Sequence, residues 1–367
     1  MTPKTVEVHR IAMQSPGDMS GLDRLITEKK INPEHIVAIF GKTEGNGGVN
    51  DFTREYASRT FASTLASHLG STPAEVETSV ALVMSGGTEG ILSPHATVFC
   101  RAPAATNGSK GKRLAVGLAL TRDFLPEELG TAVQIEETAR AVKAAMQDAE
   151  IEHPDDVHFV QIKCPLLTAE RVQSAKSRGH ATITDDSYGS MAYSRGASAL
   201  GVARALGEVT TPLSDDMILE DFSLYSSVAS TSAGIELLHN VVVVLGNSPT
   251  SQSQYRIAHS VMRDAIDLEG VLKAFTNAGV VKQGTLQIDT GRVVNVFAKA
   301  EPSPDGMVRS FRHTMLDDTD ISATRHARAA VGGVIGSLSG CGAIYVSGGA
   351  EHQGPSCGGP VAVIALA

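Results

Sequence analysis

The sequence contains no tryptophan, and aromatic residues make up only 4% of its 367 positions. Proteins that bind single-stranded nucleic acid stack bases on aromatic side chains, so this scarcity argues against such a surface. The formal net charge of −9 also argues against a general polyanion-binding protein. We therefore expect no nucleic-acid partner.

Long apolar runs are missing as well. The longest purely aliphatic run, Val241 to Leu245, is far shorter than the roughly 20 residues of a membrane-spanning helix. The opening residues MTPKTVEVHRIAMQ lack the apolar core of a signal peptide. The four cysteines form no C-x-x-C or zinc-site spacing, so we expect free thiols. These absences predict a cytoplasmic protein with no membrane partner.

An internal threefold repeat organises the chain. Apolar, strand-like runs end in lysine three times, as VAIFGK at Lys42, HFVQIK at Lys163 and VNVFAK at Lys299. Helix-like stretches of small residues carry an arginine three times, and apolar runs end in serine three times. The arginines are Arg54, Arg195 and Arg325, and the serines are Ser85, Ser230 and Ser347. The order Lys, Arg, Ser recurs at intervals close to one third of the chain, which predicts three similar units.

The same order of elements is predicted in each unit. The first unit spans residues 1–104, the second 112–250 and the third 255–367, with boundary loops rich in Gly, Pro and Ser. Hydrophobic periodicity in each unit indicates strand, helix, strand, helix, strand, strand. We therefore predict an α/β fold of three structurally similar domains around a pseudo-threefold axis. Each domain is a short β-sheet flanked by helices, and the active site is at the centre.

Such a repeat would bring the marked side chains into one central cavity. Like charges disfavour ionisation of a neighbouring lysine, and a neutral lysine can accept the proton of a serine hydroxyl. Glycines after Ser85 and Ser347 leave backbone N–H groups open to a developing oxyanion. Taken singly, a lysine at a strand end is usually solvated and a serine before Gly-Gly is usually a turn residue. The threefold repetition of all three residue types favours a functional cavity.

Several longer motifs resemble one family. The chain resembles the cyanuric acid hydrolase and barbiturase family in five motifs: GKTEGNGGVNDFTREYA, MSGGTEGILSPH, YSRGASALG, NVFAKAEPSPDG and VSGGAEHQGP. The resemblance covers essentially the whole chain. It implies three similar domains around a pseudo-threefold axis. It also implies a ring-opening amidohydrolase of s-triazine degradation, which converts cyanuric acid to carboxybiuret and then to biuret and carbon dioxide. The family further suggests a homotetramer.

The resemblance also implies roles for individual residues. It favours Ser230 as the nucleophile and Lys163 as its base, and Ser230 differs from the other two serines because Thr-Ser follows it. The supporting pairs would be Lys42 with Ser85 and Lys299 with Ser347. The implied substrate-binding set comprises the three serines, Arg54, Arg195, Arg325, Gly86, Thr231 and Gly348.

No cofactor is expected for catalysis, but the resemblance implies a non-catalytic divalent cation, magnesium or calcium, in the third unit. Its side-chain ligand would be Glu301. Its carbonyl ligands would lie in the loop AEHQGPSCG, at Ala350, Gln353, Gly354, Pro355 and Gly358. Hard cations prefer oxygen ligands, and a loop rich in Gly and Pro can turn several carbonyls inward.

Two alternative functions remain open on sequence alone. A barbiturase would open a pyrimidine ring, barbituric acid, to ureidomalonate by the same chemistry. A non-catalytic protein that binds a small planar anion would keep the arginines and the glycine loops, but it would not need lysines paired with serines.

Overall fold

The computed structural model describes residues 3–105, 111–282, 284 and 287–367. In this part of the chain, each unit contains one four-stranded sheet, and the three sheets share one strand order. The order is first, last, second, third strand: β1-β4-β2-β3, β5-β8-β6-β7 and β9-β14-β10-β13. The prediction of an α/β fold built from three similar parts is therefore confirmed.

The first unit contains β1 (Lys4–Ala12), α1 (Ser20–Thr27), β2 (Ile36–Thr43), α2 (Phe52–Leu69), α3 (Pro73–Ser79), β3 (Ala81–Gly86) and β4 (His95–Pro103). The second contains β5 (Arg113–Leu120), α4 (Ala132–Asp148), β6 (Val157–Pro165), α5 (Ala169–Ser177), α6 (Ser187–Leu206), β7 (Ala229–Gly234) and β8 (Val241–Ser248). The third contains β9 (Tyr255–Met262), α7 (Leu268–Asn277), β10 (Val293–Ala300), β11 (Met307–Val308), β12 (Phe311–Arg312), α8 (Ala323–Ser339), β13 (Tyr345–Gly348) and β14 (Gly359–Leu366).

Local sequence signals explain the ends of the three arginine-bearing helices. The side chain of Asp51 caps α2, and that of Asp186 caps α6, by accepting backbone N–H bonds of the first turn. Helices α2, α6 and α8 all end at a glycine in the left-handed conformation, a backbone geometry that glycine adopts without strain. These glycines are Gly70, Gly207 and Gly340.

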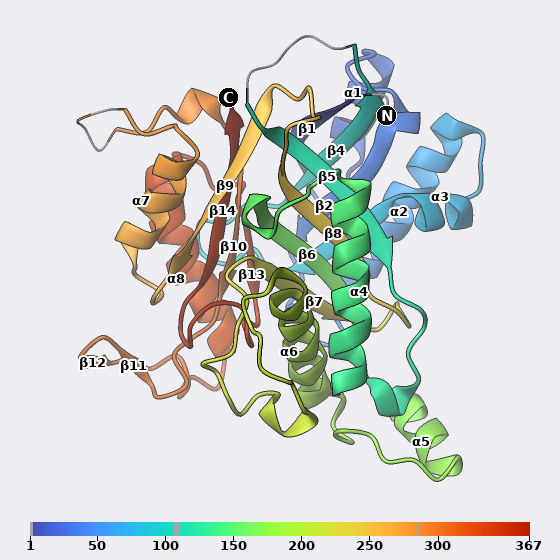
Figure 1. Ribbon diagram of the computed structural model, residues 1–367, viewed down its shortest axis with the longest axis vertical. Helices are drawn as coiled ribbons and strands as arrows, with labels where there is room; N and C mark the ends of the chain where they lie inside the picture. The colour runs from blue at the N-terminus through green and yellow to red at the C-terminus, as the bar shows by residue number, and fades with distance from the viewer. Residues whose placement is uncertain (1–2, 106–110, 283, 285–286) are drawn as a thin grey trace.

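Both faces of each sheet are buried. The outer faces pack under the helices, such as α4 and α6 over the second sheet and α7 and α8 beside the third (Figure 1). The inner faces of all three sheets meet in one central cluster that includes Phe40, Phe159, Phe297 and Tyr345. The rings of Phe40 and Phe297 lie edge to face with centroids 6.0 Å apart. This shared core fixes the ends of the three central strands relative to one another.

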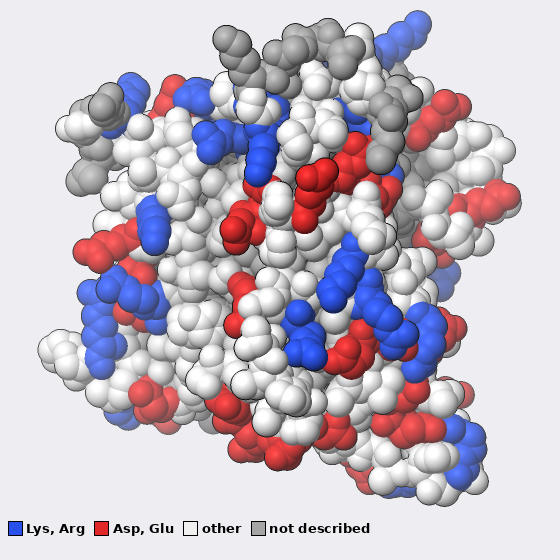
Figure 2. All heavy atoms as spheres, in the orientation of Figure 1, with Lys and Arg blue, Asp and Glu red and all other residues white. Residues whose placement is uncertain are grey.

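The surface bears charges of both signs. On the face in Figure 2, Lys and Arg side chains are interspersed with Asp and Glu. In the described residues, no helix combines the length and the apolar character needed to cross a bilayer.

Candidate active site

Strand register sets each of the three lysines opposite a serine. In the parallel pair β2–β3, Lys42 faces Ser85, and in the parallel pair β10–β13, Lys299 faces Ser347. Parallel pairing of β6 with β7 sets Lys163 opposite Ser232. The three Lys–Ser pairs are thus equivalent positions of the repeat.

The three serine hydroxyls meet at the centre of the molecule. Ser85 Oγ donates to Ser347 Oγ at 3.2 Å, and Ser232 Oγ lies 3.2 Å from Ser347 Oγ. Lys42 Nζ donates to Ser85 Oγ at 3.1 Å, and Lys299 Nζ donates to Ser347 Oγ at 3.2 Å. The fold therefore gathers alcohols from all three units, with the amines of Lys42 and Lys299, at one point. The Lys163 amine instead donates to Met84 O at 3.0 Å.

The predicted pairing of Lys163 with Ser230 is wrong. Ser230 lies opposite Gln161, and its hydroxyl donates to Gln161 Oε1 at 2.9 Å. Ser230 therefore occupies in the second unit the strand position that Tyr345 occupies in the third unit. Its side chain lies one layer of side chains away from the three clustered serines. Residues two apart on a strand share a face, so the apolar run before either serine fits the pattern equally well.

The predicted residue after the second serine is wrong for the same reason. The residue that follows Ser232 is Ala233, and not Thr231. Ala233 lines the central cavity with Gly86 and Gly348, the other two predicted residues of this kind. Thr231 instead uses its backbone N–H to bond Gln353 Oε1 at 2.7 Å. Alignment of SGGTE, SAGIE and SGGAE on their shared Ser, Gly and Glu would have identified Ser232 from sequence.

The predicted arginines need one correction. Arg54 and Arg195 line the small central cavity, but the third arginine there is Arg328 and not Arg325. The Arg325 side chain is 38% exposed and pairs with Glu89, whereas that of Arg328 is 4% exposed. Arg328 shares the buried face of α8 with Gly332 and Ile335, at spacings of 4 and 3, so helical periodicity was the signal that separates the two arginines.

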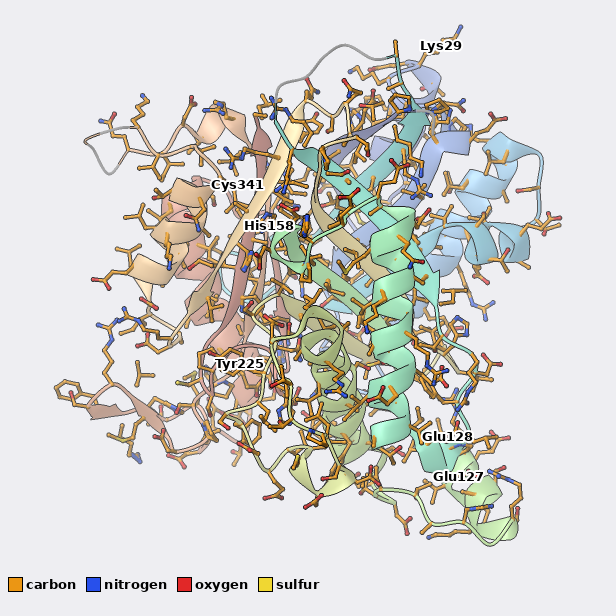
Figure 3. The ribbon with its side chains drawn as sticks, viewed as in Figure 1. Lys29, Glu127, Glu128, His158, Tyr225 and Cys341 are labelled. Carbon is orange, nitrogen blue, oxygen red and sulfur yellow. The ribbon has the colours of Figure 1, made fainter. Side chains whose placement is uncertain are left out.

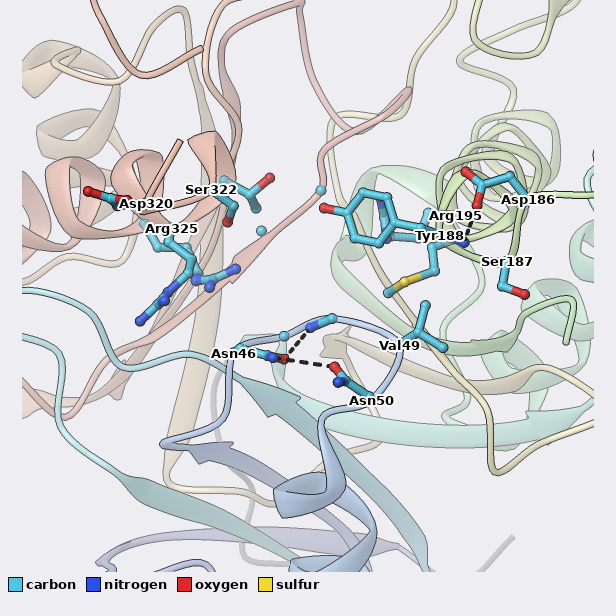
Figure 4. A pocket seen from close by; sticks show the side chains of 17 residues that line it. Asn46, Val49, Asn50, Asp186, Ser187, Tyr188, Arg195, Asp320, Ser322 and Arg325 are labelled. Carbon is cyan, nitrogen blue, oxygen red and sulfur yellow. Dashed lines mark hydrogen bonds between the residues drawn. The ribbon is translucent and has the colours of Figure 1, made fainter. Parts of the chain in front are cut away.

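The central cavity adjoins a larger hollow that opens outward. The inner cavity, of about 30 Å³, has the three clustered serines and three arginines on its wall. The outer hollow, of about 580 Å³, shares five lining residues with it: Gly47, Met191, Arg195, Arg328 and Gly348. Figure 4 shows this hollow with Tyr188 and Arg195 on one side, Arg325 and Ser322 on the other, and Asn46 and Asn50 between them.

Burial and neighbouring cations favour neutral lysines. Lys42, Lys163 and Lys299 are at most 1% exposed. Burial lowers the pKa of Lys299 to about 7, and the charge of Arg195 acts in the same direction. Burial also lowers the pKa of Lys42 and of Lys163, reinforced by Arg328 and by Arg54 respectively. Neutral amines beside hydroxyls are what a lysine-activated serine requires.

A ring of three glutamates, which the sequence reasoning missed, surrounds these groups. Each glutamate follows its clustered serine by four residues. Glu89 Oε1 accepts from Arg328 Nη2 at 2.7 Å, and Glu351 Oε2 accepts from Arg195 Nε at 2.8 Å. Glu236 Oε1 instead lies 3.1 Å from Lys163 Nζ.

The groups around Glu301 fit a hard divalent cation. The Glu301 carboxylate accepts from Gly349 N at 2.7 Å, next to the loop that the resemblance implicates. Burial and the charge of Glu351 raise the pKa of Glu301 to about 7, so nearby positive charge would stabilise its ionised form. His352, Gly354 and Cys357 of this loop have positive φ angles, and the loop contains two turns, closed by Gln353 N to Ala350 O and by Gly358 N to Pro355 O. Carboxylate and carbonyl oxygens are the donors that such cations prefer.

Serines paired with lysines of lowered pKa define the class of enzyme that transfers acyl groups through a serine. The family model for "Amidohydrolase ring-opening protein" matches residues 7–366. The chain belongs to this family of ring-opening amidohydrolases and is a hydrolase. The resemblance noted from the motifs is confirmed, and a non-catalytic anion-binding protein is not supported.

Individual relatives are similar to this chain along its whole length. The chain is 62% identical to a cyanuric acid amidohydrolase of Bradyrhizobium diazoefficiens, covering 100% of this chain and 99% of that one. It is 58% identical to a cyanuric acid amidohydrolase of Pseudomonas sp. (strain ADP), covering 99% of each. A solved cyanuric acid hydrolase superposes with a TM-score of 0.95 at 57% identity, covering 100% of each chain. The enzyme from A. caulinodans gives a TM-score of 0.89 at 50% identity, covering 99% of each chain.

Proposed function

We propose that this hydrolase opens the ring of cyanuric acid to give carboxybiuret, which loses carbon dioxide to give biuret. The observation that carries the proposal is the threefold set of Lys–Ser pairs and arginines around one small cavity. Cyanuric acid has three equivalent carbonyls and three ring nitrogens, so its symmetry matches that of the site. It is also an acidic imide, which a cationic cavity attracts.

We assign Ser232 as the nucleophile and Lys163 as its base. The Ser232 oxygen attacks a ring carbonyl carbon while the Lys163 amine accepts the hydroxyl proton. The C–N bond then breaks, and Lys163 returns the proton to the departing ring nitrogen. Water hydrolyses the resulting acyl-serine and releases carboxybiuret. The support for this pair is its asymmetry, because Lys163 pairs with a carboxylate, which neither Lys42 nor Lys299 does among the described residues.

The other two pairs would hold the remaining carbonyls. Lys42 Nζ also donates to Gly86 O at 3.2 Å, and Lys299 Nζ to Gly348 O at 2.7 Å, which fixes both amines beside their serines. Arg54 Nη1 donates to Ala233 O at 3.1 Å and so orients the peptide between Ala233 and Gly234. The N–H of the preceding peptide, that of Ala233, is where an oxyanion would be stabilised.

A substrate comparison tests the proposal. Purified enzyme is assayed on cyanuric acid and on barbituric acid, with biuret and ureidomalonate measured separately. We expect biuret from cyanuric acid and no ring opening of barbituric acid. The reverse pattern would identify a barbiturase, and activity on neither ring would reject the proposed substrate class.

We also propose that Glu301 and the carbonyls of Ala350, Gln353, Gly354, Pro355 and Gly358 hold a structural magnesium or calcium ion. The ion would neutralise neighbouring carboxylates and stabilise the loop that carries Glu351. The carbonyls of Ala350 and Pro355 each accept one backbone hydrogen bond, which leaves a second lone pair on each oxygen.

We propose that the enzyme is cytoplasmic and assembles as a homotetramer, as the family resemblance suggests. All four cysteines are free thiols, in keeping with a reducing compartment.

The β11–β12 hairpin projects from the body at the lower left of Figure 1 and exposes 79% of Phe311, which is suited to a contact between copies. Light scattering on the purified protein measures the number of copies.

A further inference from the structure

The three units differ at one contact in the central site. In the first and third units, the glutamate that follows the clustered serine by four residues pairs with an arginine from a neighbouring unit: Glu89 with Arg328 and Glu351 with Arg195. By the same rule Glu236 would pair with Arg54. It pairs instead with Lys163, at 3.1 Å.

The glycines that lie two residues after the clustered serines show the same difference between the units. A side chain at Gly87 or at Gly349 would collide with the guanidinium of Arg328 or of Arg195. A side chain at Gly234, the equivalent position in the second unit, would collide with the carboxylate of Glu236. The group that packs on the glycine is therefore a carboxylate in the second unit and an arginine in the other two.

Arg54 has other partners. Its Nη2 donates to Gly48 O at 2.7 Å and its Nη1 to Ala233 O at 3.1 Å, both backbone carbonyls. The carboxylate of Glu236 is thus free of the arginine clamp and available to Lys163.

A separate cavity reaches this ion pair from the other side. It has a volume of about 730 Å³, and both Lys163 and Glu236 are on its wall. It shares no lining residue with the central cavity or with the hollow in Figure 4. The Lys163 side chain is only 1% exposed, whereas that of Glu236 is 23% exposed. Glu236 is therefore the member of the pair that is more accessible to solvent in this cavity.

We propose that Glu236 is the positioning residue of Lys163 and relays its proton to water in the second cavity. Hydrolysis of the acyl-serine gives a carboxyl group that leaves as its carboxylate, so each turnover releases one proton, and Lys163 accepts it and becomes an ammonium. The ammonium gives that proton to the Glu236 carboxylate, and the resulting carboxylic acid releases it to water. The neutral amine then accepts the proton of Ser232. This inference rests on the proposed role of Lys163 as the base.

The charges around the pair bear on its pH dependence. Burial lowers the pKa of Lys163, and Glu236 opposes that effect. Burial acts to raise the pKa of Glu236, but the charges of Lys163 and Arg54 outweigh it, so the net shift is downward. The other titratable groups that face the pair or the cavity are Cys164, Arg171, Glu55, Arg59, Glu77, Arg101, Asp148 and His239.

Glu236→Gln tests the relay. We expect kcat to fall at least about tenfold with KM within about twofold, because the variant removes proton transfer and leaves the substrate wall intact. The acid limb of the kcat profile should also move to lower pH, since the carboxylate no longer favours protonated Lys163. The matched control is Glu89→Gln, which loosens Arg328 and should raise KM without moving that limb.

Two further variants separate the relay from a structural role. Gly234→Ala keeps every charge but displaces the Glu236 carboxylate, and Gly234 lies in β7 without a left-handed φ, so alanine fits its backbone. We expect it to lower kcat as Glu236→Gln does. In Glu236→Ala, formate entering through the cavity should restore part of kcat, and chloride at equal ionic strength should not.

The outcomes distinguish the relay from the proposed function. Lys163→Ala that retains turnover would overturn the role of Lys163 as the base. Lys163→Ala that is inactive, with Glu236→Gln showing wild-type kcat and an unmoved acid limb, would overturn the relay alone. If Glu236→Gln does not fold, wild-type kinetics of Gly234→Ala, or no formate rescue of Glu236→Ala, would overturn the relay.

Discussion

Ser232 Oγ and Ser347 Oγ lie 3.2 Å apart although 115 residues separate them in the chain. Ser85 Oγ donates to the same Ser347 hydroxyl at 3.2 Å, so one contact point joins all three units. Lysines whose pKa is lowered by burial flank this point. The arrangement makes one site from three repeats, and a substrate at the axis would contact a Lys–Ser pair from each unit.

Replacing the two serines of β7 separates the nucleophile from its neighbour. Ser232→Ala should lower kcat by at least about 10³-fold, because it removes the attacking oxygen. Ser230→Ala, the matched control on the same strand, should keep turnover and lose about 1 kcal/mol of stability through its buried hydrogen bond to Gln161. Steady-state kinetics and denaturant unfolding measure the two effects. Greater loss of activity in Ser230→Ala would reverse our correction.

Replacing the two arginines of α8 should likewise have different effects, here on the KM for the substrate. Arg328→Ala should raise KM by at least about tenfold, because it removes a cation from the cavity wall and leaves the Glu89 carboxylate without that partner. Arg325→Ala should change KM by less than about threefold, since its side chain is 38% exposed and exposed ion pairs contribute little. Initial-rate kinetics on both variants decide the point, and equal effects would contradict the correction.

Acid should destabilise the fold through a histidine pair between the second and third units. His158 is labelled in Figure 3, and its Nδ1 lies 2.9 Å from His259 Nδ1, so one neutral ring donates and the other accepts. Burial lowers the pKa of each imidazole to about 4. A charge on His259 lowers the pKa of His158 further, and the charge of Lys273 does the same to His259.

The sign of this effect follows from proton linkage. The unfolded chain binds more protons than the folded one between the ordinary pKa near 6.5 and the folded value near 4. Stability is therefore complete above about pH 6.5 and is lost as the pH falls toward about 4. Thermal unfolding across this range should show a steeper loss for the wild type than for His158→Gln/His259→Gln. Parallel curves would exclude the pair as the cause.

Removal of the proposed cation should weaken the third unit. Chelation followed by gel filtration should lower the melting temperature by several degrees, and added magnesium or calcium should restore it. Glu301→Gln should show the lower melting temperature without chelation and respond little to added metal. Elemental analysis of the untreated protein gives the metal content. A protein without bound metal, and with a melting temperature unaffected by chelation, would reject the cation site.

The repeat and the fold class could be predicted from sequence because they depend on periodic signals. Lys42, Lys163 and Lys299 each lie one or two residues before the end of a buried strand, and that pattern survives divergence of the surrounding residues. Helix and strand order followed from hydrophobic periodicity in the same way.

Individual site residues were harder to assign because local patterns were degenerate. Ser230 and Ser232 share one face of a strand, so the apolar run before them does not separate the two. Either the shared Ser-x-Gly-x-Glu pattern or the register with β6 is needed to show that Ser232 meets Ser347. Arg325 and Arg328 are one helical turn apart, and burial on α8 separates them. The pairing of Glu236 with Lys163 breaks the threefold rule, so no argument from repetition could have found it.

Mass spectrometry of the acid-quenched reaction tests the central claim most directly. Enzyme mixed with excess cyanuric acid is stopped within the first turnover, digested, and its peptides fragmented to locate the added acyl mass. Our account predicts the added mass on Ser232 and its loss in Ser232→Ala. An acyl group on Ser85, Ser347 or Ser230 would contradict it.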